Sequence, residues 1–250
     1  MYEKKRTSGE LKQLAREALI GRYGVMAGAS ALMIALNVLS VLLPDWIFPG
    51  YSIFSQIGRF IASVVIALLV SLFGAGYARL ALDAAYGQKP PFGNMLYPFF
   101  HHPDRFLLAY LILTLIQTVL QIPVYLISNL FSPAVSSSGT MALDEALSYL
   151  TVVLLCSSIS TFIYVLITLR FAMTTYLLLD YDAIGPVQSL KESARIMKGH
   201  KGRYFYLSIS FFGVLLLGCL TCGIGFLWAM PYMETTIAFF YRDLKHDIPE

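Results

Sequence analysis

Long apolar stretches alternate with short polar segments along the whole chain, and this alternation is the dominant pattern of the sequence. A helix that crosses the hydrocarbon region of a bilayer needs about 20 predominantly apolar residues, and several stretches reach or approach that length. The pattern therefore predicts an all-α, polytopic integral membrane protein with six transmembrane helices in three hairpins. The predicted spans are residues 23–43, 57–80, 106–127, a part of 148–179, 204–220 and 224–241.

Three of these stretches have unusual lengths. The stretch 148–179 is too long for a perpendicular crossing at about 1.5 Å per residue, so we expect its helix to tilt or to project from the membrane. The last two stretches are short, and residues 221–223 join them in a tight turn. A single re-entrant pair is therefore the alternative to two full crossings in this region.

Lys and Arg fall almost entirely on one side of the predicted membrane. The loops 44–56 and 128–147 contain neither residue, whereas the alternate segments carry nearly all of them. Cytoplasmic loops are enriched in Lys and Arg, so we expect both termini in the cytoplasm and the chain in the plasma membrane. Arg59, close to the outer face, is expected to reach the headgroups. The chain is predicted to form one membrane domain, made of a cytoplasmic amphipathic segment (1–22), a six-helix bundle (23–241) and a cytoplasmic tail (242–250).

Composition favours a membrane protein over a soluble one. Hydrophobic residues make up 57% of the 250 residues and charged residues only 13%, about half the usual share in a soluble domain. The net charge of +3 comes from the one-sided segments, so no nucleic-acid partner is needed to explain it. The expected partners are membrane lipids, with anionic headgroups at the cytoplasmic face, and other membrane proteins or a second copy of the chain.

A short motif occurs twice. The segments 11–16 and 190–195 are similar, and each is followed by Gly-Arg-Tyr and an apolar stretch. Both have the spacing of amphipathic helices, with Leu11 and Ala15 on one face of the first. We expect such helices to lie in the cytoplasmic interface, with their apolar faces toward the acyl chains. The segment 92–102 resembles a third copy, which suggests three units of one interfacial helix and one hairpin.

Two ionisable residues lie well away from the ends of their predicted spans, Arg170 in the fourth and Glu234 in the sixth. Their depths are similar if Asp180 and Asp243 mark equivalent helix ends. A charge at membrane depth usually faces a partner or water, so we predict an Arg170–Glu234 ion pair. Two roles for the pair are open: a proton or ion coupling site, and a structural contact that fixes how the helices meet.

Polar side chains also form stripes on two predicted helices. On the third, Gln117 and Gln121 are four residues apart and share a face. On the fourth, Thr161 and Tyr164 are three residues apart and also share a face. The two stripes either line a wet cavity or hydrogen-bond to neighbouring helices. Thr114 and Thr118 extend the first stripe, and Ser157 and Thr168 extend the second.

No residue pattern predicts a cofactor, a metal ion or a catalytic site. Cys219 and Cys222 have the Cys-x-x-Cys spacing of redox and metal sites. Their apolar, glycine-rich flanks favour small packed side chains instead, and a disulfide between them is left open. The four histidines all fall in predicted cytoplasmic segments, away from any nucleophile inside the membrane. The chain is therefore expected not to be an enzyme.

The two ends of the chain carry motifs of a known family. In the C-terminal third these are a run from Gln188 to Gly199, Gly223-Ile224-Gly225, Pro231-Tyr232 and a run from Phe240 to Leu244. With the stretch from Glu10 to Gly21, the chain resembles over essentially its whole length a family of bacterial membrane proteins, domain of unknown function nine-seven-five. It is also distantly similar to the membrane domain of some glycerophosphodiester phosphodiesterases. The resemblance implies a six-helix membrane protein and supplies no catalytic residues.

Three classes of function agree with these observations. The preferred one is a non-enzymatic scaffold or accessory protein that binds lipids or other membrane proteins. The second is a transporter or permease for a small solute or ion, with its polar site at Arg170 and Glu234. The third is a membrane enzyme that acts on lipid substrates. Solute flux that depends on Glu234 would separate the second class from the first.

Overall fold

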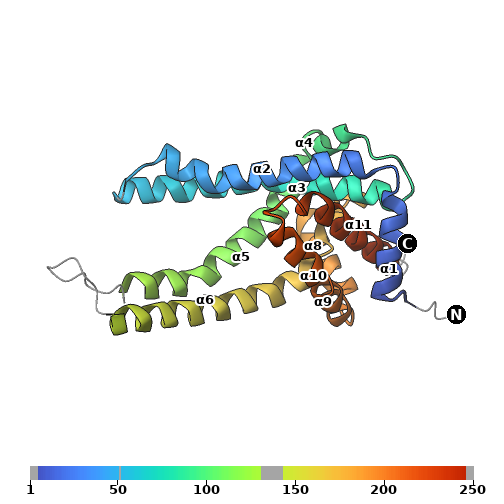
Figure 1. Cartoon of the computed structure of the whole chain (residues 1–250). Coiled ribbons are helices and arrows are strands. Elements are labelled where there is room, and N and C mark those ends of the chain that lie inside the picture. The colour runs from blue at the N-terminus through green and yellow to red at the C-terminus, as the bar shows by residue number, and fades with distance from the viewer. Residues whose placement is uncertain (1–4, 51, 131–142, 246–250) are drawn as a thin grey trace.

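The computed structural model describes residues 5–50, 52–130 and 143–245, and every regular element in them is a helix. Two long helical hairpins extend from one end of the molecule, where the shorter elements gather (Figure 1). We call this end the core end. The long hairpins pair α2 (Tyr23–Ile47) with α3 (Ile53–Ala85), and α5 (Pro103–Leu130) with α6 (Leu143–Phe171).

The two long hairpins diverge away from the core end (Figure 1). Their main mutual contact is between α3 and α5. In the most apolar stretches of α5 and α6, 6% of the residues are buried, compared with 22% in α2 and α3. Most of the apolar surface of the α5–α6 hairpin is therefore left for lipid or for another protein.

Short helices surround the inner ends of α2, α3 and α5 and form the core end. Its central element is α11, which packs mainly against α1, α2 and α3. Large side chains such as Leu80, Leu177 and Phe240 are fully buried there. The short elements are α1 (Ser8–Leu19), η1 (Phe92–Leu96), α4 (Tyr97–Phe100), α7 (Thr174–Asp180), α8 (Pro186–Ile196), α9 (Lys201–Ile209), α10 (Phe212–Leu220) and α11 (Phe226–Lys245).

One glycine fixes how closely η1 approaches α3. Most residues in the stretch 72–85 of α3 are buried, and η1 crosses this stretch at Gly76. A β-carbon at Gly76 would overlap the backbone carbonyl of Met95 in η1. Because glycine has no β-carbon, the backbone of η1 can approach the backbone of α3 closely at this position. The inner half of α3 is thus enclosed on the side of η1 as well as by α2 and α11.

The N-terminal helix α1 begins with a capping box. The Thr7 hydroxyl accepts a hydrogen bond from the Glu10 amide (3.3 Å), and the Glu10 carboxylate accepts one from the Thr7 amide (2.6 Å). The apolar face of α1, formed by Leu11, Ala15 and Leu19, is fully buried, mainly against α11. The prediction that this face contacts acyl chains is therefore wrong, because the protein itself covers it. The apolar face of α8 is likewise covered, by α5, α6 and α7.

Within the described residues, five helical stretches are long and apolar enough to cross a bilayer, by length and composition. The sixth predicted span, 224–241, forms most of α11, and this helix is not one of them because it carries the charges of Glu234, Arg242 and Asp243. The six-span arrangement therefore stays a prediction. The five stretches are Tyr23–Ile47, Ile53–Ala85, Pro103–Ser128, Asp144–Asp180 and Lys201–Leu220.

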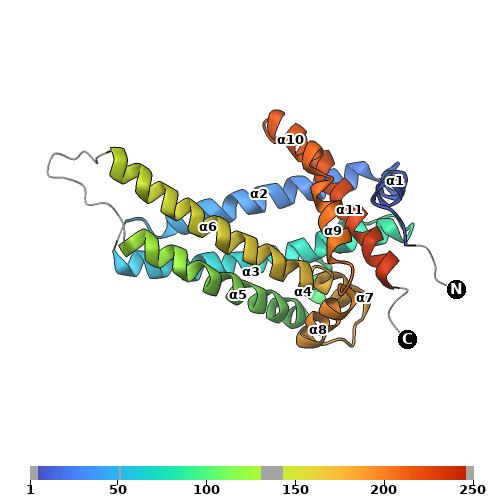
Figure 2. The same ribbon diagram turned by 90° about the horizontal axis from the view of Figure 1, so that it is seen from below.

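Two predicted spans are broken into shorter helices. The long fourth span is interrupted between Phe171, where α6 ends, and Thr174, where α7 begins. The fifth is interrupted between Ile209 in α9 and Phe212 in α10. Figure 2 shows that α9, α10 and α11 run across the direction of the long hairpins. The third pair of helices is therefore not parallel to the first two, as a simple bundle would require.

The turn between α10 and α11 has the hydrogen bonds of a Schellman motif. The Gly223 amide donates to the carbonyl of Gly218 (3.0 Å), and the Cys222 amide donates to that of Cys219 (3.1 Å). Cys222 and Gly223 have φ angles of 51° and 91°. The Thr221 hydroxyl then accepts a 2.9 Å hydrogen bond from the Gly225 amide at the start of α11. The tight turn expected at 221–223 is thus present.

Basic residues concentrate at the core end. Of the described Lys and Arg residues, all but Arg59 lie in the short elements there, in the loops between them or at the adjoining ends of the long helices (Figure 1). Arg59 lies near the opposite end of α3, where its guanidinium is 3.5 Å from the carboxylate of Asp45. The structure thus gathers at one end the charges from which the membrane orientation was predicted.

Candidate functional site: a carboxylate bound to a tyrosine and an apolar groove

Glu234 is held by a tyrosine at the core end. Glu234 lies in α11 and Tyr176 in α7, and the tyrosine hydroxyl donates a 2.6 Å hydrogen bond to Glu234 Oε1. Tyr176 is only 2% exposed, and its ring stacks on Tyr241 with the centroids 5.3 Å apart. A hydrogen bond to a carboxylate in such a shielded site is among the stronger ones in proteins. It ties α7 firmly to α11.

Three further tyrosines, from α3, α5 and α9, lie within electrostatic range of Glu234. Two of them also make hydrogen bonds between helices. Tyr77 Oη lies 2.7 Å from Ser30 Oγ, which joins α3 to α2, and Tyr110 Oη lies 2.8 Å from Thr175 Oγ1, which joins α5 to α7. We call the group the tyrosine cluster: Glu234, Tyr77, Tyr110, Tyr176 and Tyr204.

The tyrosine cluster is suited to two tasks. Its hydrogen bonds join α2 to α3, α5 to α7 and α7 to α11, which is a structural role. A carboxyl group that is hydrogen-bonded to one phenol and interacts electrostatically with three more is also able to bind or pass on a proton. The hydroxyls of Thr174, two residues before Tyr176, and of Thr235, the residue after Glu234, are buried without a hydrogen-bond partner among the described residues. Such groups are rare in proteins and leave hydrogen-bonding capacity for water or a small ligand.

The predicted Arg170–Glu234 ion pair is not formed. Among the described residues Glu234 is bound to Tyr176, and no ion pair joins it to Arg170. Arg170 is exposed at the end of α6, and the Ser193 hydroxyl donates a 3.3 Å hydrogen bond to its backbone carbonyl. The reason lies in how the helices are placed. α6 packs on α5, α8 and α9, whereas α11 packs mainly on α1, α2 and α3.

The two predicted polar stripes do not meet in one cavity. Gln117 and Gln121 are exposed on α5, whereas Thr161 lines a groove beside α6 and Tyr164 is half-buried outside the lining of that groove. The hydroxyls that connect α6 to α5 are those of Ser160, which donates a 2.9 Å hydrogen bond to the Leu120 carbonyl, and Tyr149, which donates a 3.3 Å hydrogen bond to the Ser128 carbonyl. The hydroxyls of the other stripe members donate to backbone carbonyls of their own helices: Thr118 to Thr114, Thr168 to Val165 and Ser157 to Leu154. Ser157 also lines the groove.

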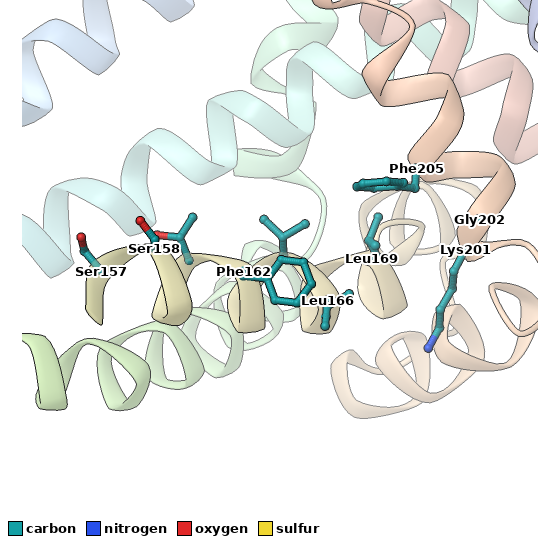
Figure 3. A pocket seen from close by; sticks show the side chains of 10 residues that line it. Ser157, Ser158, Phe162, Leu166, Leu169, Lys201, Gly202 and Phe205 are labelled. Carbon is teal, nitrogen blue, oxygen red and sulfur yellow. The ribbon is translucent and has the colours of Figure 1, made fainter. Parts of the chain in front are cut away.

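The groove runs along α6 and ends beneath α9 (Figure 3). Its volume is about 960 Å³. The α6 wall is mainly apolar with three hydroxyls. α9 contributes an aromatic ring and Lys201, whose side chain extends away from the Phe205 ring (Figure 3). The lining residues are Ser157, Ser158, Thr161, Phe162, Val165, Leu166 and Leu169 from α6, and Lys201, Gly202 and Phe205 from α9.

A network of charges closes the core end around α11. The Asp180 carboxylate accepts hydrogen bonds from Tyr241 Oη (2.9 Å) and Lys245 Nζ (2.6 Å). Partial burial lowers the pKa of Lys245, but the hydrogen bond to Asp180 and its charge outweigh this, so the net pKa is raised. Arg203 forms a second ion pair with Asp243 of α11. These contacts attach the end of α11 to α7 and α9.

The cysteine pair stays free of any cross-link. Cys219 and Cys222 are both free thiols and both exposed, one at the end of α10 and one in the following turn. Among the described residues, no three His, Cys, Asp or Glu side chains are placed to hold a metal ion. The expectation that the chain binds neither a metal ion nor a cofactor stays a prediction.

The sequence did not single out two residues that define these sites, Tyr176 and Lys201. Tyr176 belongs to an apolar run in which its ring counted as hydrophobic, although a buried tyrosine hydroxyl normally finds a partner. Lys201 belongs to a basic segment that membrane orientation already explained. A search for tyrosines inside apolar stretches would have found the first, and no sequence signal distinguishes the second from Lys198.

No curated protein and no solved structure matches the chain. The similarity to the membrane domain of glycerophosphodiester phosphodiesterases is accordingly not shown. Residues 1–247 match the sequence pattern of a family described as "Protein of unknown function (DUF975)". Because this match covers nearly the whole chain, the protein belongs to the DUF975 family.

Proposed function

We propose that the protein is a non-enzymatic membrane scaffold or accessory protein, which holds lipids or other membrane proteins against its long hairpins. The observation that carries this proposal is the divergence of the two hairpins, which leaves the α5–α6 hairpin with 6% of its most apolar residues buried. A protein that conducts a solute by itself encloses a path between its helices. Two diverging hairpins instead offer apolar faces to their surroundings.

The proposed location is the plasma membrane, with the core end and both termini in the cytoplasm. This orientation is supported by the basic residues, which gather at the core end. An epitope tag at the N-terminus and another inserted between α2 and α3 test it. We expect only the second tag to be reached from outside intact cells. Tags reported in the same compartment would contradict the proposed orientation.

For the third helix pair we propose the re-entrant arrangement. The support is its direction across the long hairpins and the enclosure of the second half of α11 by α1, α2 and α3. Cys222 provides the test, in a variant that lacks the other two cysteines. A membrane-impermeant thiol reagent should label Trp46→Cys, at the outer end of α2, from outside the cell and should not label Cys222. Labelling of Cys222 from outside would establish six crossings.

The scaffold role is tested by photo-crosslinking in the cell. A photoreactive amino acid is placed at Leu115 or Val119 on α5, which are 55% and 61% exposed. The control is Val187 at the start of α8, which is 53% exposed but lies outside the candidate spans. We expect lipid and one recurrent membrane protein to be captured on α5 only. Equal capture at Val187, or no capture on α5, would contradict the scaffold role.

A transporter is the second candidate, and the tyrosine cluster is the specific observation that favours it. The half-buried Glu234 carboxylate accepts a hydrogen bond from Tyr176, and the buried hydroxyls of Thr235, next to Glu234, and of Thr174, two residues before Tyr176, have no partner among the described residues; this arrangement resembles a site that binds a proton. Proton flux into proteoliposomes, followed with a pH-sensitive dye, decides between the candidates. A flux that requires the protein, disappears in Glu234→Gln and persists in Glu145→Gln, an exposed residue of α6, would replace the scaffold by a transporter.

A further inference from the structure

We infer that the groove between α6 and α9 binds an anionic phospholipid, with one acyl chain along α6 and the phosphate at Lys201. This inference deepens the proposed function by naming the lipid class, and it rests on that function for the placement of the hairpins in the membrane. The lipid would come from the leaflet at the core end, because Lys201 lies at that end of the groove (Figure 3).

The dimensions of the groove fit one leaflet. Its lining extends along α6 from Ser157 to Leu169, which at the rise of an α-helix is about 18 Å. Half of the hydrocarbon thickness of a bilayer is about 15 Å. The volume of about 960 Å³ lies within the range of pockets that hold lipid-sized ligands. An acyl chain that starts at the headgroup depth of Lys201 would therefore end near the far end of the groove, at the bilayer midplane.

The charge of the groove selects an anion. Lys201 is the one charged residue among the ten that line it, and none of the ten is acidic. Lys201 is exposed, and no described residue is hydrogen-bonded to its ammonium group or pairs with it. Arg203, two residues further along α9, is occupied by Asp243. The ammonium of Lys201 is therefore available to a phosphate, in the way basic residues at a membrane surface attract anionic lipids.

The proposed placement of the hairpins in the membrane favours an apolar occupant over a water-soluble one. Both walls belong to stretches that are, by length and composition, able to cross a bilayer, so in that placement the groove faces hydrocarbon. The alternative occupants are a helix of another membrane protein and a helix of a second copy. A helix would seat one apolar face in the groove but would leave the ammonium group of Lys201 without an anionic partner. A phospholipid supplies both an acyl chain for the apolar wall and a phosphate for the ammonium group.

Lipid retention tests the inference with two matched pairs of variants. The full-length protein is placed in nanodiscs of equal parts phosphatidylglycerol and phosphatidylcholine, and the lipids that stay bound are measured by native mass spectrometry. Lys201→Gln removes the cation, and Lys198→Gln removes an exposed cation that does not line the groove. Gly202→Leu fills the groove, and Gly213→Leu adds the same side chain in α10. A β-carbon at either glycine would meet no atom within 4 Å, so both variants should fold.

We expect wild type to retain phosphatidylglycerol in preference to phosphatidylcholine. Lys201→Gln should lower this preference about fivefold, and Gly202→Leu should remove the bound lipid of either kind, while both control variants behave as wild type. The inference is overturned if wild type shows no preference, if Lys198→Gln has the same effect as Lys201→Gln, or if Gly202→Leu retains the lipid. It is also overturned if a photoreactive group at Phe162 captures a protein helix in place of lipid.

These outcomes are distinct from a failure of the scaffold role. A negative lipid result leaves the crosslinking at Leu115 and Val119 unaffected, because α5 contributes none of the residues that line the groove. A transporter that shows Glu234-dependent proton flux would in turn leave the phosphatidylglycerol preference measurable. The two proposals can therefore fail separately.

Discussion

The two halves of α3 differ sharply in their surroundings, although both are apolar. In the inner half Leu80 is 0% exposed, enclosed by the short elements of the core end. In the outer half Leu69 is 49% exposed and Phe60 is 55% exposed. The difference teaches that the hydrophobicity of α3 indicates a helix suited to a membrane and nothing about what surrounds each half. Which half is held by protein and which is left to lipid depends on neighbours that lie far away in the sequence.

Small and polar residues mark the inner half. Gly76 admits the backbone of η1, Tyr77 bonds to Ser30 of α2, and the buried Asp83 accepts from Asn94 at 2.7 Å and pairs with Arg79 at 3.1 Å. The outer half presents large aliphatic and aromatic side chains instead. Specific contacts therefore hold the core end together, whereas the outer hairpins need only a hydrophobic environment. The following variants are designed to break or sharpen this comparison.

The largest effect is expected for Gly76→Ala. The added β-carbon overlaps the Met95 carbonyl, and two backbone segments have to separate, so we expect a loss of about 4 kcal/mol in the free energy of unfolding. Gly74→Ala is the control, because a β-carbon there would meet only the Met33 side chain at an ordinary 3.8 Å. Denaturant titration in detergent, followed by circular dichroism, measures both. Equal stability of the two variants would show that η1 does not press on α3.

A substitution in each half of α3 compares them directly. Leu80→Ala leaves a cavity inside protein and should cost about 3 kcal/mol. Leu69→Ala lies in the half that faces lipid or detergent, which can fill the space, and should cost less than about 1 kcal/mol. The same unfolding titration applies. A cost at Leu69 as large as that at Leu80 would mean that the outer half is also enclosed by protein.

Removal of one hydroxyl from the tyrosine cluster should have an intermediate effect. Tyr176→Phe leaves Glu234 without its hydrogen-bond donor and is expected to cost about 2 kcal/mol. Tyr206→Phe serves as the control, since Tyr206 is 67% exposed on α9 and should change stability very little. Thermal unfolding in detergent separates the two variants. If Tyr176→Phe is as stable as Tyr206→Phe, the hydrogen bond to Glu234 contributes nothing to the core end.

The smallest effect is a dependence on alkaline pH. The folded-state pKa of Lys245 is raised above its usual value, so its ion pair with Asp180 contributes fully below about pH 10. This contribution is lost as the pH rises through the folded-state pKa, and it is modest because Lys245 is 38% exposed. Melting temperatures between pH 8 and 11 should fall more steeply for wild type than for Lys245→Met. Parallel pH curves would remove Lys245 from the account.

The sequence predicted the elements better than their neighbours. The expected span 23–43 corresponds to α2 (Tyr23–Ile47), because twenty or more apolar residues determine a helix by themselves. The expected span 57–80 stops short of α3 (Ile53–Ala85). From the sequence alone, the polar residues Arg79 and Asp83 indicate the end of the apolar span. In the structure, however, the helix continues past them, and Asp83 is buried in it and forms an ion pair with Arg79.

The candidate site was less predictable. Arg170 and Glu234 were paired by their depths along two helices, but depth does not specify which helices are adjacent. The amphipathic pattern of α1 showed that one face needed cover, and it did not show that α11 rather than lipid supplies the cover. In both cases the sequence gives a chemical requirement that several neighbours are able to meet. Only the arrangement of the helices selects one.

The central claim is that the core end is held by protein while the outer hairpins face lipid. A scan of single spin labels along α3 in liposomes, with collision rates for molecular oxygen measured at each position from 57 to 82 except Gly76, tests it most directly. We predict high oxygen accessibility on the exposed faces up to Leu69 and uniformly low accessibility from Leu72 onward. Uniform accessibility along the whole helix, or low values throughout the outer half, would contradict the account.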